Sequence, residues 1–151
     1  MVKKIFLILF ILFIILQFFQ PTKPEVKNDN PKDLIVNNSD IPTEISMMLK
    51  TSCYDCHSNE TSYPWYSNIS PVSFLVIRDI EVGRGELNFS NWESLSKLEK
   101  AGALDDIIGA VGEGEMPMKI YTTIHRDAML SDDDVELLVA WAENYSEKLF
   151  E

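Results

Sequence analysis

Apolar residues follow three different patterns along the chain. Residues 5–16 form an unbroken apolar run, whereas residues 20–40 are rich in Pro, Asn, Lys and Asp and show no helical period. From residue 41 onward, apolar residues recur at spacings of three and four, which is typical of helices that bury one face, and strand-like alternation is nearly absent. We therefore expect an apolar helix over residues 1–19, a flexible linker over 20–40 and an all-helical domain over 41–151.

The periodic part of the chain predicts four helices. Pro42 and Pro71 suit the first turns of the first two helices, because proline has no amide hydrogen to lose at that position. Gly83 weakens the second helix, and Ser131 with Asp134 resembles a capping box at the start of the last one. The four helices are expected over residues 41–53, 71–83, 92–111 and 132–149.

The N-terminal run is intermediate in length between the core of a signal peptide and a membrane span, which needs about 17–25 residues. No small-x-small cleavage pattern follows Phe19, so we consider both an uncleaved anchor and a removed signal peptide. Lys3 and Lys4 predict that the N-terminus stays in the cytoplasm. We expect a bacterial inner-membrane protein whose domain faces the periplasm, or a periplasmic one if the segment is cleaved. A flexible linker of 20 residues would span about 25 Å and let the domain reorient.

The composition suits one acidic domain. The 151 residues include 24 acidic and 13 basic ones, giving a net charge of −11, and Lys3 and Lys4 precede the apolar run. This balance argues against nucleic acid, whose phosphates favour a basic surface. It suits a domain whose protein partners carry basic docking patches.

Both cysteines of the chain lie in one short motif, Cys53-Tyr54-Asp55-Cys56-His57. The spacing C-x-x-C-H is the attachment sequence of c-type haem. Two thiols one helical turn apart can each add to one vinyl group of the haem, and the adjacent histidine can bind the iron. We therefore expect one covalent haem c, attached at Cys53 and Cys56, with His57 as an axial ligand.

Three other interpretations of the cysteine pair are weaker. A disulfide with this spacing would close a tiny loop and stabilise little. A thioredoxin-like redox pair belongs to an α/β fold, and strands are not expected here. A zinc site would have only His125 as a further ligand beyond His57.

The second axial ligand of the iron is left open between three residues. Met116, Met118 and His125 all lie between the last two predicted helices. Met116 precedes Pro117, and a thioether suits an apolar haem face, so Met116 is favoured. His125 would give a bis-histidine iron, although a surface histidine is its ordinary role.

Other residues are candidates for the wall of the haem pocket. Trp65 and Tyr66 follow Pro64 and have apolar rings with polar tips, which can cover a porphyrin. Pro71 could offer its carbonyl to the second ring nitrogen of His57. Arg78 and Arg84 could pair with the haem propionates.

The sequence resembles the haem-binding domain family of bacterial envelope proteins. The similarity is carried by "CYDCHSNETSYPWYSNISPVS", "LNFSNW", "GEMP" and "YTTIH", and it covers nearly all of residues 41–145. The overall order also looks like that of a small c-type cytochrome, with four helices around the haem. The resemblance implies haem c at Cys53 and Cys56, with His57 on the iron.

The expected function is one-electron transfer between partners in the bacterial envelope. No acid–base pair, nucleophile triad or phosphate loop is visible, so the chain is not expected to be an enzyme. The alternative is a haem module with an open or exchangeable sixth iron site, which would act as a small-ligand sensor or a weak peroxidase.

Overall fold

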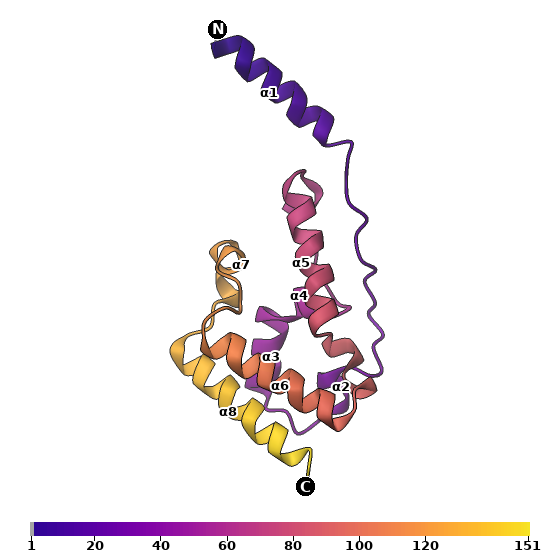
Figure 1. Cartoon of the computed structure of the whole chain (residues 1–151), viewed down its shortest axis with the longest axis vertical. Helices are drawn as coiled ribbons and strands as arrows, with labels where there is room; N and C mark the ends of the chain where they lie inside the picture. The colour runs from indigo at the N-terminus through magenta and orange to yellow at the C-terminus, as the bar shows by residue number, and fades with distance from the viewer. Residues whose placement is uncertain (1) are drawn as a thin grey trace.

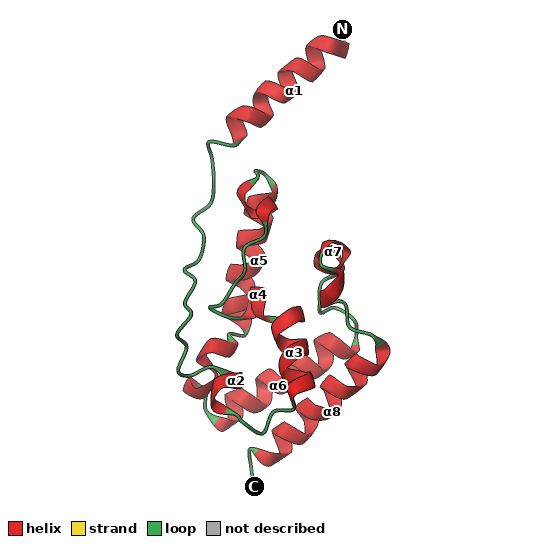
Figure 2. Cartoon of the chain, turned by 180° about the vertical axis from the view of Figure 1, so that it is seen from behind, coloured by secondary structure: helices red, strands yellow, loops and turns green. Residues whose placement is uncertain are grey.

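The computed structural model describes residues 2–151 and contains helices but no strands over that range (Figures 1 and 2). The α-helices are α1 (Val2–Leu16), α2 (Leu34–Asn37), α3 (Thr43–Ser52), α4 (Tyr54–His57), α5 (Val72–Glu86), α6 (Lys97–Gly112), α7 (Lys119–Ile124) and α8 (Asp132–Lys148). Three 3₁₀ turns are η1 (Trp65–Asn68), η2 (Phe89–Ser94) and η3 (Arg126–Ala128). The all-helical class is confirmed. The helices are more numerous than the four expected, because short helices form within segments expected to be loops.

Helices α6 and α8 lie side by side and run in opposite directions (Figure 1). Each begins with a capping box, Ser96 with Glu99 in α6 and Ser131 with Asp134 in α8. The expected start of the third helix at Trp92 is wrong, because Trp92 lies fully buried in the 3₁₀ turn that precedes α6. Helix α3 crosses this pair and completes a core that also takes in α2 and η2. The fully buried apolar side chains of this core include Leu34, Ile45, Leu49, Trp92, Leu104 and Ala142.

Residues 20–40 do not form the free linker that their composition predicts. The amide of Lys27 donates to the carbonyl of Asn59 at 2.8 Å, and the hydroxyl of Tyr63 donates to the carbonyl of Pro24 at 2.8 Å. Leu34 is fully buried and belongs to the core of the domain. Hydrogen bonds to distant residues of the body hold most of this segment, which has little regular secondary structure of its own. Such bonds leave no periodic pattern in the sequence.

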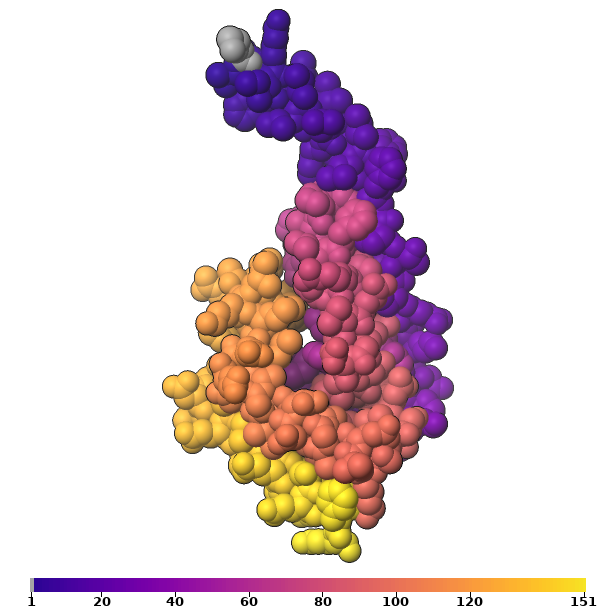
Figure 3. Space-filling view, in the orientation of Figure 1, coloured from indigo at the N-terminus to yellow at the C-terminus, as the bar shows by residue number. Residues whose placement is uncertain are grey.

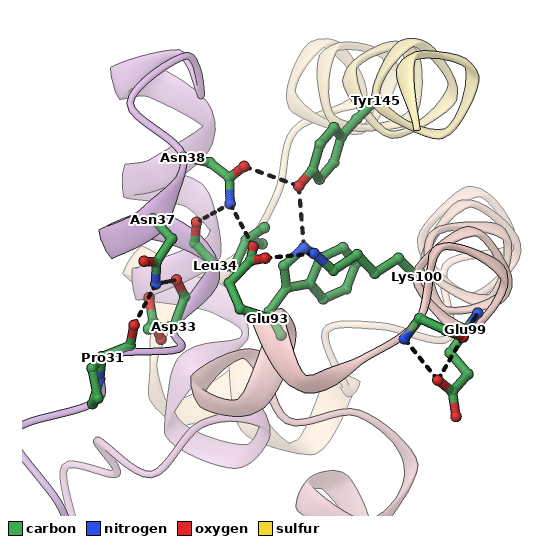
Figure 4. Close-up of polar contacts among 11 residues, drawn as sticks. Pro31, Asp33, Leu34, Asn37, Asn38, Glu93, Glu99, Lys100 and Tyr145 are labelled. Carbon is green, nitrogen blue, oxygen red and sulfur yellow. Dashed lines mark hydrogen bonds and ion pairs between the residues drawn. The ribbon is translucent and has the colours of Figure 1, made fainter. Parts of the chain in front are cut away.

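A polar network joins the end of this segment to the core (Figure 4). The hydroxyl of Tyr145 in α8 donates to the side chain of Asn38 at 3.1 Å and accepts from the indole of Trp92 at 3.1 Å. The same Asn38 donates to the carbonyl of Leu34 and to Glu93. Residues 34–38 are therefore part of the folded domain.

Helix α1 projects from one end of the molecule and exposes almost all of its side chains (Figures 1 and 3). Among residues 2–151, no helix has both the length and the apolar character required to cross a membrane. The segment after α1 contacts the body at once, since the side chain of Gln17 exchanges two hydrogen bonds with the backbone of Ser70, at 2.9 and 3.0 Å.

Candidate functional site

The two cysteines lie at a one-turn helix, with Cys53 as its N-cap and Cys56 within it. Cys53 ends α3 and begins α4, with φ −125° and ψ −40°, so the chain changes direction at the first thiol. Its carbonyl accepts from the amides of Cys56 at 3.1 Å and His57 at 2.9 Å. This single turn brings both thiols to one side of α4, and both are free.

Helix α5 packs against α4 at a glycine. A Cβ atom on Gly83 would lie 2.9 Å from the backbone oxygen of Cys56, which is too close for any side chain. We expected Gly83 to weaken the second helix, but α5 continues through it to Glu86. The glycine therefore serves the close approach of two helices, and it fixes α4 against a rigid neighbour.

The imidazole of His57 is oriented by the residue that follows α5. Its Nδ1 lies 3.1 Å from the carbonyl oxygen of Leu87, so Nδ1 carries the proton and donates, and Nε2 keeps its lone pair. The carbonyl of Leu87, and not that of Pro71 as expected, holds the ring. Burial lowers the pKa of His57, partly offset by the hydrogen bond to Leu87. A neutral imidazole with a free Nε2 is the form that binds iron.

A cavity of about 340 Å³ separates the cysteine motif from the segment Met116-Pro117-Met118. Cys53, Cys56 and His57 line it together with Met116 and Met118. Two smaller hollows of about 110 Å³ each adjoin it and are lined mainly by apolar side chains. One extends past Met116 to Phe89 and Val111, and the other past Met118 to Leu75 and Ile80.

The end of α6 fixes the position of the segment Met116-Pro117-Met118. Gly114, with φ +70°, reverses the chain, and the amide of Met116 then donates to the carbonyl of Ala110 at 3.0 Å. Met116 remains 37% exposed, and Met118 is half-buried between the main cavity and one hollow. Both methionines therefore face the cysteine motif.

His125 lies outside the main cavity. Its Nε2 is 2.7 Å from the hydroxyl of Tyr66, and its ring stacks on Tyr121 at 4.4 Å. Tyr66 lines one of the adjoining hollows. Trp65, the other expected wall residue, is 75% exposed and is not among the residues that line these cavities.

The two expected propionate partners differ in their surroundings. Arg78 lines the main cavity, and its exposed guanidinium pairs with Asp79 at 2.7 Å. Arg84 instead donates to the carbonyl of Glu25 and to the hydroxyl of Thr61, which fastens the N-terminal segment to the body.

The sequence did not predict two tyrosine–aspartate hydrogen bonds around the cysteine motif. Tyr121 of α7 donates to Asp55 of α4 at 2.8 Å, and burial together with this bond raises the pKa of Tyr121. Tyr54 donates at 3.1 Å to Asp33, which is only 1% exposed. The partners are far apart in sequence, so no spacing rule could have linked them.

Burial disfavours the thiolate form of both cysteines. It raises the pKa of Cys53 to about 12 and that of Cys56 to about 11, with the neighbouring thiol and Asp55 as secondary causes. A redox-active cysteine pair has a pKa shifted in the opposite direction, because the thiolate is the nucleophile. Within residues 2–151, no group of three His, Cys, Asp or Glu side chains could hold a metal ion.

Helix α4 carries the cysteine motif, and the motif shares one mainly apolar cavity with Met116 and Met118. This arrangement is that of a helical cofactor-binding domain. The family model described as haem-binding domain matches residues 11–144, and the chain belongs to this family. Comparisons with curated proteins and with solved structures found no match. A haem cofactor fits the site, because both thiols, His57 and Met116 line one cavity whose surface is mainly apolar.

Proposed function

We propose that this haem-binding protein is a monohaem c-type protein. Cys53 and Cys56 would hold one haem through thioether bonds, and Nε2 of His57 would bind the iron. The observation that carries the proposal is the bond from His57 Nδ1 to Leu87, because it directs Nε2 away from the backbone while both thiols lie beside the same cavity. Bound haem supplies one-electron chemistry through its iron.

Met116 is the proposed second ligand. Met116 and Met118 already line the main cavity, so either thioether could approach the iron with a change of rotamer. His125 would first have to break its bond to Tyr66 and its stack on Tyr121. The two histidine contacts therefore favour methionine, and Met116 is preferred because Pro117 and the end of α6 restrict its backbone.

The proposed role is one-electron transfer in the bacterial envelope. The mainly apolar lining of the cavity would surround the cofactor, and its thiols and His57 would hold it, which suits electron transfer. The acidic surface of the chain favours redox partners with basic docking patches. Helix α1, apolar on every side after Lys3 and Lys4 in its first turn, is proposed to anchor the domain in the inner membrane on its periplasmic side.

Haem retention after denaturation tests the central proposal. The full chain is expressed in a host that attaches haem c, then denatured and extracted with acidified solvent. Colour should stay with the polypeptide, and the Cys53→Ala, Cys56→Ala double variant should lose it. Extraction of all haem from the wild-type chain would refute covalent attachment.

Carbon monoxide binding separates electron transfer from the alternative role as a ligand sensor or weak peroxidase. A reduced protein with both axial positions filled should stay low-spin and bind the gas slowly or not at all. Rapid binding to the wild-type protein would indicate an open sixth site, and the electron-transfer proposal would then be abandoned.

A further inference from the structure

Two segments of this acidic chain contain no carboxylate. Residues 61–78 and 116–126 have neither Asp nor Glu, although the chain has 24 of them, and they include Arg78, Lys119 and Arg126. The first segment forms η1 and the start of α5, and the second forms α7. Both lie at the end of the body from which α1 projects, as two opposite views show (Figures 1 and 2). We call these two segments the carboxylate-free end.

Large apolar side chains are exposed on this end. Trp65 is 75% exposed, Ile120 68% and Phe74 45%, and Leu75 and Ile124 are also largely exposed. Trp65 and Phe74 do not line the cavities of the site, so a cofactor there would leave both uncovered. Apolar groups gathered on one surface of a domain usually mark a contact with another protein or with lipid.

Hydrogen bonds fix this end directly to the base of α1. Besides the two bonds between Gln17 and Ser70, the hydroxyl of Ser70 donates to the carbonyl of Phe19 at 2.7 Å. Lys23 donates to the side chain of Asn68 at 2.8 Å. These hydrogen bonds fix α1 directly to the carboxylate-free end. A free linker would instead allow an end-to-end distance of about 25 Å.

We propose that the carboxylate-free end rests on the lipid surface beside α1, with Trp65 and Phe74 in the boundary between head groups and acyl chains. This inference depends on the membrane anchoring of α1 proposed above. Tryptophan favours that boundary because its ring is apolar and its N–H is polar, and Lys119 and Arg126 attract anionic lipids. Helix α1 has 15 residues and is about 22 Å long, shorter than an apolar layer of about 30 Å, so the residues that follow it enter the boundary.

The remaining charge distribution fits the same orientation. Helix α8, with six acidic residues and one lysine, lies at the opposite end of the body from α1 (Figure 1), where it would face away from the lipid. A lipid surface that carries negative charge repels carboxylates, and the two segments of the carboxylate-free end lack them, although Asp79 beside the first segment pairs with Arg78. The haem site would then be held close to the membrane, with α8 free to meet basic partners.

Hydroxyl-radical footprinting of the haem-loaded full chain in vesicles tests the orientation. Vesicles of phosphatidylethanolamine and phosphatidylglycerol are used, and oxidation of Trp65 is normalised to that of Met47, an exposed residue of α3. The Lys119→Glu, Arg126→Glu variant should raise the oxidation of Trp65 at least threefold. The matched Lys97→Glu, Lys148→Glu variant makes the same charge change on α6 and α8 and should leave it unchanged.

Three results would overturn the inference. Equal oxidation of Trp65 in the wild type and the first variant would mean that no lipid protects this end. Protection that weakens as the lipid-to-protein ratio rises would identify a second copy of the chain as the occupant. A chain that does not float with the vesicles would refute the anchoring of α1 as well, whereas floating with Trp65 unprotected would refute only the docking.

Discussion

His57 Nδ1 and the backbone oxygen of Leu87 lie 3.1 Å apart, and this bond connects the cysteine motif to the end of α5. The carbonyl is available because α5 ends at Glu86 and Leu87 is extended, with φ −148° and ψ 127°. The motif alone supplies a histidine beside two thiols. The end of α5 decides which ring nitrogen of His57 can bind a metal.

Replacing Met116 should remove the second axial ligand. In the haem-loaded Met116→Ala variant, we expect the ferric spectrum to lose most of its low-spin character, the reduced form to bind carbon monoxide rapidly, and the midpoint potential to fall, since a thioether ligand raises it. Met118→Ala and His125→Ala are the controls and should keep the low-spin spectrum. A low-spin Met116→Ala protein together with a high-spin His125→Ala protein would instead identify histidine as the ligand.

Adding a methyl group at Gly83 should disturb the motif helix. A Cβ there would meet the backbone oxygen of Cys56 at 2.9 Å, so Gly83→Ala should lower the free energy of unfolding by about 1–3 kcal/mol and reduce haem incorporation. The matched control is Gly85→Ala in the same helix, where nothing lies within 4 Å. That change should be neutral or stabilise the protein by up to about 1 kcal/mol. Thermal or denaturant unfolding of the two variants compares them, and equal stability would contradict the steric argument.

Removing the buried carboxylate of Asp33 should weaken the attachment of residues 30–40 to the motif. Asp33 caps α2 by accepting from the amide of Ile35 at 2.9 Å, and it also accepts from the hydroxyl of Tyr54. Asp33→Ala should lower the free energy of unfolding by about 1–3 kcal/mol, because a cap is lost and a buried hydroxyl loses its partner. Asp29→Ala, at an exposed position of the same segment, is the control and should change little. Limited proteolysis should cut residues 20–40 faster in the Asp33 variant only.

The capping box of α8 should contribute stability that disappears in acid. Hydrogen bonds from the side chain and backbone of Ser131 lower the pKa of Asp134 below its ordinary value of 3.8. A carboxyl whose pKa is lower in the folded chain stabilises the fold above its ordinary pKa, and the effect is lost as the pH falls through the folded value. Asp134→Asn should therefore lower Tm by a few degrees at pH 7 and by almost nothing near pH ~2.

The neighbouring Asp133→Asn variant is the control for the capping box. It removes one charge from the same turn of α8 and leaves the three hydrogen bonds between Ser131 and Asp134 in place. Its effect on Tm at pH 7 should be smaller than that of Asp134→Asn. An equal effect would mean that the helix dipole, and not the capping bonds, accounts for the stabilisation.

The sequence by itself determined the helical class, the approximate positions of α3, α5, α6 and α8, and the motif at Cys53, Cys56 and His57. These features depend on residues within one or two turns of each other, where apolar spacing, prolines and capping pairs act directly. The start of α8 was predicted for this reason, since Ser131 and Asp134 lie three residues apart. The interpretation of C-x-x-C-H likewise needed only five consecutive residues.

Only the tertiary structure decided what surrounds the motif. Leu87 holds His57, Tyr66 engages His125, and Gln17 joins Ser70, and the three pairs lie 30, 59 and 53 residues apart. Residues 20–40 look like a linker because they lack helical periodicity, yet hydrogen bonds to distant residues hold them in place. Such contacts form when helices pack, and a local pattern carries no information about them. The sequence therefore named the residues that could bind a cofactor, and the ends of α5 and α6 determined how His57 and Met116 are placed.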